Sequence, residues 1–377
     1  MPQHKTAIRW KGDEIVPTKK SKKRIEIIDV AKCIAIFMVV LGHSATNSEL
    51  LNNPPLLFRI LYSIHMPLFF FLSGLSISPK TLKNWGEWRF FLRKTVLTIA
   101  IPYLIWALVF CNFSFENLGW ILYGSWIGLG KTGTVTSLWY LACLFVARIL
   151  VQLAISLMVR TSRGNNRLIY LIPATVCMAV GVLLPTIEIG YPWCFNVACV
   201  AAGFILLGMA VKNGVIELSV QKGWVLLSLL AASVAVFSLF VYLRGDSFGM
   251  MLMAAGYYGD PFFALVFAVI GGFAVLALSM ILKRMANEWL SGMNLQPLNY
   301  LGQHTMGVFL LHKPMLQNIF IPAFGQLLPG GPDILVRLLA TTAAILVSMW
   351  LCKLIEYYIP ELVGIFSKDK IMGTEKT

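Results

Sequence analysis

Long apolar segments constrain this chain more than any other feature of its sequence. Ten of them are each close to the length that a helix needs to cross a bilayer core of about 30 Å. We expect these spans at about 25–45, 57–77, 95–113, 137–159, 168–187, 193–211, 224–243, 262–282, 304–322 and 335–357. The sequence therefore predicts an all-α polytopic membrane protein with about ten transmembrane helices.

The basic residues lie mainly in alternate connecting segments. If the N-terminus is cytoplasmic, the segments on that side carry 23 of the 31 lysines and arginines. The segments on the opposite side carry only Lys131 and Arg244. Cytoplasmic loops of membrane proteins show this excess of positive charge. The distribution predicts that both ends of the chain are cytoplasmic, which requires an even number of spans.

The composition leaves room for one membrane domain and two short tails. The chain of 377 residues is 58% hydrophobic and only 13% charged, which is about half the charged share of a soluble domain. We expect a basic cytoplasmic tail at 1–24, a membrane domain at 25–357 and a cytoplasmic tail at 358–377. The net charge of +14 lies in tails and loops, which indicates topology rather than nucleic-acid binding. The seven cysteines include no CxxC pair that would indicate a metal or redox site.

Three ionisable residues, Asp29, Lys32 and His43, interrupt the first apolar segment. On a helix, Lys32 and His43 differ by about 20° around the axis, and Asp29 lies within about 40° of His43. Ionisable groups inside a membrane are costly and usually functional. A neutral imidazole can also accept a proton from an attacking hydroxyl. We interpret this face as a candidate catalytic surface, although an interfacial histidine remains the simpler alternative for His43.

Two further histidines stand within predicted spans. His65 lies in the apolar stretch SIHMPLFFFLSG, so it must face a cavity or bond to a neighbouring helix. His312 is followed by Lys313 and Pro314 near the middle of the ninth span. That combination predicts a broken helix that lines a cavity.

Basic and aromatic side chains at the third and fourth spans are weaker candidates. Arg89, Arg93 and Lys94 precede the third span, where they either anchor the topology or hold the phosphates of an anionic cytoplasmic donor. Arg148 lies inside the fourth span and must face the protein interior or a wet cavity. Trp139 is most simply interpreted as part of an interfacial aromatic belt.

The sequence contains no Ser-His-Asp spacing and no metal-ligand motif. The residues alone predict a helical bundle with a buried, histidine-rich cavity and a basic cytoplasmic mouth. Such a bundle could belong to an enzyme or to a transporter.

Several stretches together resemble the membrane acyltransferase family 3, and especially its fucose 4-O-acetylase-like branch. The first-helix pattern of that family is Arg or Lys, ten residues and then His, which Lys32 and His43 match. The second-helix pattern, a histidine before Met-Pro-Leu-Phe-Phe-Phe and Ser-Gly, is matched by SIHMPLFFFLSG. Later stretches follow in the order of the family, among them RKTVLTIAIPYLIW, SLWYLACLF, YYGDPFFALVFAVIGG and YLGQHTMGVFLLHKPM. Arg89 and Arg93 are one residue too far apart for the Arg-x-x-Arg motif of some relatives.

The resemblance implies an integral membrane O-acyltransferase of the bacterial cytoplasmic membrane. Such an enzyme would take an acyl group, expected to be acetyl, from cytoplasmic acyl-CoA as co-substrate, with no bound cofactor and no metal. It would place that group on a sugar hydroxyl of a surface or lipid-linked glycan. The expected partners are the lipid bilayer and the glycan or lipid-linked sugar acceptor, and not nucleic acid.

The resemblance also suggests roles for individual residues. His43 would act as general base or transient acyl carrier, and Asp29 and Lys32 would orient the site and bind charge. His65 and His312 would line the acceptor cavity. Arg93 and Lys94 would attract the phosphates of CoA, with Arg89, Arg148 and Trp139 as further substrate-binding candidates.

Two alternatives to this enzyme stay open from the sequence. A secondary transporter or exporter of a glycan or lipid intermediate could use the buried histidines and Lys32 as a proton relay. An inactive relative that serves as a membrane scaffold is less consistent with intact Lys32, His43 and His65.

Overall fold

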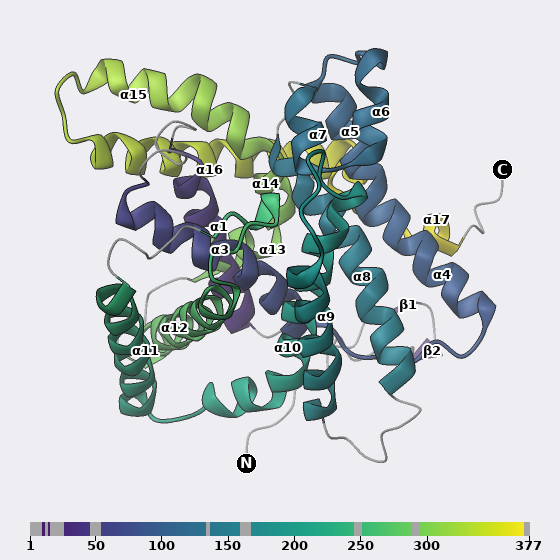
Figure 1. Ribbon diagram of the computed structural model, residues 1–377, viewed down its shortest axis with the longest axis horizontal. Coiled ribbons are helices and arrows are strands. Elements are labelled where there is room, and N and C mark those ends of the chain that lie inside the picture. The colour runs from purple at the N-terminus through teal and green to yellow at the C-terminus, as the bar shows by residue number, and fades with distance from the viewer. Residues whose placement is uncertain are drawn as a thin grey trace.

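The computed structural model describes residues 10–11, 14–15, 26–45, 54–132, 136–158, 167–244, 251–288 and 295–372. Near the N-terminus, β1 (Trp10–Lys11) and β2 (Glu14–Ile15) form a short antiparallel pair. Helices make up most of the rest of the described chain, as Figure 1 shows.

A helix occupies each of the ten predicted spans. In chain order these helices are α1 (Glu26–Gly42), α3 (Leu56–Ser76), α4 (Trp85–Thr95) continued by the π-helical turn η1 (Val96–Ala100) and α5 (Ile101–Phe110), α8 (Trp139–Met158), α9 (Leu171–Leu183), α10 (Phe195–Leu218), α11 (Gly223–Arg244), α12 (Pro261–Glu288), α14 (Thr305–Met315) continued by the π-helical turn η8 (Leu316–Phe320) and α15 (Ile321–Leu327), and α16 (Asp333–Tyr358). Shorter elements connect or flank them: η2 (Phe115–Asn117), α6 (Leu118–Tyr123), α7 (Trp126–Lys131), η3 (Thr136–Leu138), η4 (Arg167–Tyr170), η5 (Pro192–Cys194), η7 (Met253–Ala255), α13 (Gln296–Gln303), η9 (Pro360–Val363) and α17 (Lys368–Met372).

Seven helical segments of the described chain are long and apolar enough to cross a membrane. They contain α3, α4 with α5, α8, α10, α11, α12 and α16. The segment of η4 and α9 is apolar but shorter. These helices confirm the all-α membrane protein, while the count of ten spans and their orientation stay predictions. The two remaining helices, α1 and α14–α15, are the ones that carry Asp29, Lys32, His312 and Lys313.

The centre of the bundle is formed by α1, α3 and α10. Helix α10 packs against α3, α8 and α9, whereas α1 packs against α3, α12, α13 and α16. Helix α11 packs mainly on α12, at the edge of the molecule (Figure 1). Its side chains are largely exposed outside that contact, as suits a helix that faces lipid.

Two glycines bring the backbones of α3 and α10 into direct contact. A Cβ atom on Gly74 would lie 2.0 Å from the carbonyl oxygen of Ile205. A Cβ atom on Gly208 would lie 2.2 Å from the carbonyl oxygen of Phe71. Small residues at helix contacts allow this close approach within membranes, and it fixes α3, which carries His65, against the most buried helix of the bundle.

The expected break in the ninth span is wrong. Pro314 lies inside α14, and the helix runs on through η8 into α15. A proline removes one backbone hydrogen bond, and a local π turn can restore the bonding of the freed groups. Here the N–H of Leu316 reaches the carbonyl oxygens of both His312 and Lys313. The helix therefore stays continuous past these two residues.

Candidate active site

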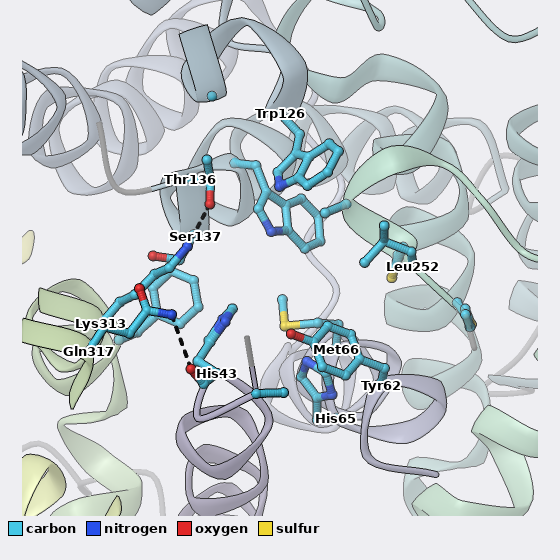
Figure 2. Close-up of a pocket in the computed structure, with 17 residues that line it drawn as sticks. His43, Tyr62, His65, Met66, Trp126, Thr136, Ser137, Leu252, Lys313 and Gln317 are labelled. Carbon is cyan, nitrogen blue, oxygen red and sulfur yellow. Dashed lines mark hydrogen bonds between the residues drawn. The ribbon is translucent and has the colours of Figure 1, made fainter. Parts of the chain in front are cut away.

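A pocket of about 370 Å³ lies beyond the end of α1, and we call it the histidine pocket. Its volume falls in the range of small-molecule sites, roughly 300–1,000 Å³. Figure 2 shows its open centre with side chains converging from α1, α3, α7, α14 and the η7 segment. The lining residues are His43, Ala45, Tyr62, His65, Met66, Trp126, Gly130, Thr136, Ser137, Trp139, Met251, Leu252, Met253, Ala254, Phe309, Lys313 and Gln317.

His43 reaches the pocket because α1 ends one residue before it. Its backbone N–H donates to the Val39 carbonyl at 3.0 Å. Its carbonyl accepts a hydrogen bond of 3.2 Å from Gln317 Nε2, and the carbonyl of Ser44 accepts one of 2.5 Å from Arg337 Nη1. Contacts from η8 and α16 thus hold the end of α1, and the imidazole of His43 points into the pocket (Figure 2).

Three imidazoles gather at this end of the bundle. The ring centroids of His43 and His312 are 5.3 Å apart. His65 meets Tyr62 edge-on at 5.0 Å, and Tyr62 in turn lies 6.4 Å from His43. His65 and His312 are both buried, with 3% and 0% of their surfaces exposed. The structure therefore brings together the three histidines that the sequence singled out. His312 does not line the pocket and contacts His43 from behind its wall.

Hydrogen bonds to backbone carbonyls set the orientation of two of these rings. Nδ1 of His65 bonds to the carbonyl of Leu61, and Nδ1 of His312 bonds to that of Phe309 at 2.7 Å. A carbonyl only accepts, so each Nδ1 carries the proton and each Nε2 keeps a lone pair. In the described part of the chain, Nε2 of His312 has no hydrogen-bond partner.

The His43 ring differs from the other two because no backbone carbonyl of the described chain accepts a hydrogen bond from it. Within the described residues its side chain makes ring contacts but no hydrogen bond. A ligand in the pocket could therefore hydrogen-bond to either ring nitrogen. A histidine that lines a ligand-sized pocket in this way is a candidate general base.

The rest of the pocket wall includes a lysine and two aromatic faces. Lys313 Nζ donates to Thr136 Oγ1 at 2.7 Å, which ties α14 to η3. Trp126 and Trp139 contribute their indole rings, and Trp139 is 5% exposed. Trp139 is thus part of the pocket wall. Composition alone favoured an interfacial belt, whereas the family resemblance gave Trp139 as a substrate-binding candidate.

A second cavity, of about 680 Å³, opens between α3, α4 and α8, and we call it the basic cavity. Its cationic lining residues are Lys80, Lys94 and Arg148. Gln152 also lines it and donates to the carbonyl of Lys80 at 2.9 Å. Lys80 pairs with Glu87 at 3.2 Å, which leaves Lys94 and Arg148 as the cations of this wall without a described ion pair.

An aromatic layer of Phe69, Phe70, Tyr140 and Phe309 separates the two cavities. The ring of Tyr140 lies 6.3 Å from Phe69, 5.1 Å from Phe70 and 4.9 Å from Phe309. The Tyr140 side chain also hydrogen-bonds to Ser73, which lines the basic cavity.

The helical spacing explains why the layer lies between the cavities. On α3, Met66 lines the histidine pocket and Ser73 lines the basic cavity, with Phe69 and Phe70 between them. Seven residues of helix place Met66 and Ser73 about 10 Å apart along the axis. On α8, Tyr140 lies in the same way between Trp139 of the histidine pocket and Leu144 of the basic cavity.

Asp29 and Lys32 do not join His43 in the pocket. Asp29 is about 21 Å from His43 along α1 and is buried against α13, where Gln303 Nε2 donates to its carboxylate at 3.2 Å. Gly302 lies against the Asp29 backbone so closely that a Cβ atom would be 1.8 Å from the carbonyl oxygen. Lys32 is partly exposed and lines neither of the two cavities. Asp29, Lys32 and His43 share one face of α1, but they lie at different depths along it and so contact different parts of the protein.

Arg89 and Arg93 lie outside both cavities. Both are exposed on α4, and Arg93 Nη2 donates to the carbonyl of Lys370 in α17 at 3.0 Å. Lys94, the next residue, does line the basic cavity, together with Arg148.

Several residues of the site were not identified from the sequence as site residues. Tyr62, Trp126 and Gln317 are ordinary residues of apolar or interfacial segments, so their sequence context gives no signal. Lys313 was noted only as part of the break expected in the ninth span, and Arg337 could have been found because it is an ionisable residue inside a predicted span. Among the described residues, no group of three or more His, Cys, Asp or Glu side chains could hold a metal ion.

The fold and the two cavities are those of a multi-pass membrane protein with a buried polar site. A sequence model of the acyltransferase domain matches residues 25–353, which is most of the chain. The chain belongs to acyltransferase family 3, and it is a membrane acyltransferase. This membership favours the enzyme over the transporter. No curated protein and no solved structure matches the chain.

Proposed function

We propose that this acyltransferase moves an acetyl group from acyl-CoA to a sugar hydroxyl of a surface or lipid-linked glycan, with His43 as the central residue. The observation that carries the proposal is the position of the His43 ring, which faces a ligand-sized pocket and makes no hydrogen bond within the described chain. An imidazole with a free nitrogen can deprotonate an acceptor hydroxyl.

In this proposal the chemistry begins with the acceptor hydroxyl. A nitrogen of His43 takes the hydroxyl proton as the oxygen attacks the carbonyl carbon of the thioester. The tetrahedral intermediate collapses, the carbon–sulfur bond breaks, and the CoA thiolate leaves and takes up a proton. The second route is covalent: the imidazole attacks the thioester, the carbon–sulfur bond breaks, and the CoA thiolate leaves while the imidazole carries the acyl group. The sugar oxygen then attacks the acyl carbon, the carbon–nitrogen bond breaks, and the hydroxyl proton ends on the CoA thiolate.

The basic cavity suits the donor. Lys94 and Arg148 provide positive charge for the phosphates of CoA, because guanidinium and ammonium groups bind phosphate oxygens strongly. We assign the donor to these two residues and not to Arg89 or Arg93, which lie outside the cavity. The thioester end of CoA would then pass the aromatic layer to reach His43.

The histidine pocket suits the acceptor. Trp126 and Trp139 offer flat apolar faces to a sugar ring, and Ser137 and Gln317 offer hydrogen-bonding groups to its hydroxyls. His65 would line the acceptor space, and His312 would support the His43 ring from behind. Asp29 and Lys32 would act at a distance, by fixing α1 at its other end.

The proposal also covers the membrane in which the protein lies and the side of that membrane that each cavity faces. We infer a bacterial cytoplasmic membrane, with the basic cavity on the cytoplasmic side. The excess of Lys and Arg in the segments around α4 supports this orientation.

The proposal is tested with the full chain purified into liposomes that also contain a glycan-lipid extract. We expect radiolabel from acetyl-CoA to enter the extract, and the mass of the labelled acceptor to rise by one acetyl group. Omission of the protein is the control. Acceptor that crosses the liposome membrane with its mass unchanged, and without any need for a donor, would contradict the proposal and indicate transport.

A further inference from the structure

Lys313 places its side-chain amino group in the wall of the histidine pocket. Its ammonium group donates to the neutral hydroxyl of Thr136 at 2.7 Å, and no carboxylate of the described chain pairs with it. An ammonium group held inside a membrane protein is costly unless an anion or several polar groups stabilise it. The single hydroxyl leaves most of its capacity as a donor unused.

The rest of the wall does not neutralise this charge. None of the described residues that line the pocket is an aspartate or a glutamate. The other polar side chains are hydroxyls, one amide and two imidazoles, beside aromatic rings and methionines. A substrate therefore meets a pocket in which Lys313 is the one lysine or arginine of the described lining, among neutral polar groups and apolar surface.

We propose that Lys313 selects an acceptor that carries a negative charge close to the hydroxyl that is acylated. This inference rests on the proposed function and names the class of its acceptor. A carboxylate of an acidic sugar or a phosphate that links a sugar to a lipid provides the same chemistry, an anionic oxygen that accepts a hydrogen bond from Nζ. Lys313 lies beside His312, whose ring contacts His43, and both Lys313 and His43 border the open centre of the pocket (Figure 2). An anion bound at Lys313 would hold a neighbouring hydroxyl near His43.

The alternative role of Lys313 is structural. Its bond to Thr136 ties α14 to η3, and loss of that tie would weaken the site for every acceptor alike. The two roles differ in one observable quantity, the preference of the enzyme for a charged acceptor over a neutral one.

The test uses two pairs of acceptors that differ only in charge. One pair is an oligosaccharide with a hexuronic acid and its carboxyl-reduced form. The other is a sugar linked to a polyprenyl phosphate and the same sugar on a neutral polyprenyl ether. Comparison of the two pairs distinguishes the sugar carboxylate from the lipid phosphate. For each pair, kcat/KM and, without donor, the Kd for the acceptor are measured on the full chain.

We expect the wild-type protein to prefer the anionic member of one pair by roughly tenfold or more, since hydrogen bonds to charged groups contribute that much. Lys313→Gln should bring the ratio close to one. Lys313→Arg should keep most of the preference. Thr136→Val removes the tether but keeps the charge, so it should keep the ratio even where the overall rate falls.

Equal use of charged and neutral acceptors by the wild type, or a preference that survives Lys313→Gln, would overturn the inference. The inference would also be overturned if Thr136→Val lowered the ratio of kcat/KM for charged over neutral acceptors as much as Lys313→Gln does. The preference would then depend on the hydrogen bond between Lys313 and Thr136 and not on the charge of Lys313. The binding measurement separates this inference from the proposed function. A charge preference in Kd without any acyl transfer would contradict the proposed function and leave the role of Lys313 supported.

Discussion

The position of the His43 imidazole depends on residues that are distant in the sequence. Gln317 and Arg337 bond to the carbonyl oxygens of His43 and Ser44 at the end of α1. The Arg337 guanidinium also bonds to Asp333 and lies over the ring of Phe58 at 5.3 Å. This buried arginine is therefore placed to position His43 without touching a substrate.

Arg337→Met tests that positioning role. The change removes the donor to the Ser44 carbonyl, and a buried polar group left without its partner costs on the order of 1–3 kcal/mol. We expect kcat for acyl transfer to fall by roughly tenfold or more, because small displacements of a catalytic group are costly. The KM for acyl-CoA should stay unchanged, because the basic cavity lies beyond the aromatic layer.

Steady-state kinetics on purified protein checks this split between kcat and KM. Arg337→Lys, which keeps a donor, should recover part of kcat. A variant that is well folded and has wild-type kcat would show that Arg337 does not position His43.

At the residue scale, the sequence predicted which ionisable groups are unusual but not which of them meet. His43, His65 and His312 were identified because imidazoles are costly in apolar segments. Their contact could not be predicted, since it depends on how α1, α3 and α14 pack. The alignment of Asp29 and Lys32 with His43 was real on the helix. About 21 Å of helix nevertheless separates Asp29 from the pocket.

At the scale of elements, the contact between α3 and α10 holds the bundle together. Gly74 and Gly208 allow the two backbones to touch, so the contact has no space for a side chain. Overfilling a packed contact usually costs about 1–3 kcal/mol. A clash with a backbone carbonyl is harder to relieve than one with a side chain, because the helices themselves must separate.

Gly208→Ala should therefore destabilise the protein. The added Cβ would lie 2.2 Å from the carbonyl oxygen of Phe71. Gly214→Ala is the matched control, because it lies on the same helix and its Cβ would meet nothing within 4 Å. In the control, alanine should be neutral or stabilising, since it favours a helix over glycine by about 1 kcal/mol.

Thermal unfolding of the detergent-solubilised proteins, followed at one detergent concentration, measures the difference. We expect a lower Tm for Gly208→Ala only. Equal Tm values for the two variants would show that the close contact of α3 and α10 is not a major source of stability.

The positions of the helices were largely predictable from the sequence, whereas local helix geometry and the contacts between helices were not. Each predicted span coincides with a helix because apolar runs of this length have few other stable forms in a bilayer. The expected break at Pro314 was wrong because the sequence does not reveal that a π turn would follow and restore the bonding. The pairing of Gly74 with α10 was equally hidden, since glycine is frequent throughout such helices.

At the scale of the whole molecule, two cavities lie on either side of the aromatic layer. The basic cavity carries the charge expected for a donor site, and the histidine pocket carries the imidazoles. Under the proposed function, the two substrates would bind on different sides of this layer. Changes in one cavity should then affect one substrate and spare the other.

Lys94→Ala should raise the KM for acetyl-CoA several-fold, because it removes a charged contact to phosphate that contributes roughly 1.5–3 kcal/mol when fully formed. Arg93→Ala is the matched control, since it is the adjacent cation on α4 and lies outside the cavity. Initial rates over a range of acetyl-CoA concentrations give the KM of each variant for comparison with the wild type. A larger effect from Arg93→Ala than from Lys94→Ala would contradict the assignment of the donor to the basic cavity.

The arrangement of cavities was only partly predictable. The sequence indicated a histidine-rich cavity and a basic mouth, but it assigned Arg89 and Arg93 to that mouth together with Lys94. Helical geometry explains the difference, because Lys94 turns toward α8 while Arg93 turns toward α17. The aromatic layer was not predicted, since its rings come from α3, α8 and α14, and no local pattern marks their contact.

The most direct test of the central claim compares acyl transfer by His43→Gln and His304→Gln. The same chemical change is made inside and outside the site, because His304 pairs with Glu356 at 3.3 Å and lines neither cavity. Transfer of label from acetyl-CoA to the glycan-lipid extract is measured for equal amounts of folded protein. We predict a loss of at least about a hundredfold for His43→Gln, as expected for a general base, and near wild-type transfer for His304→Gln. Wild-type transfer by His43→Gln would contradict the account and move the chemistry away from the histidine pocket.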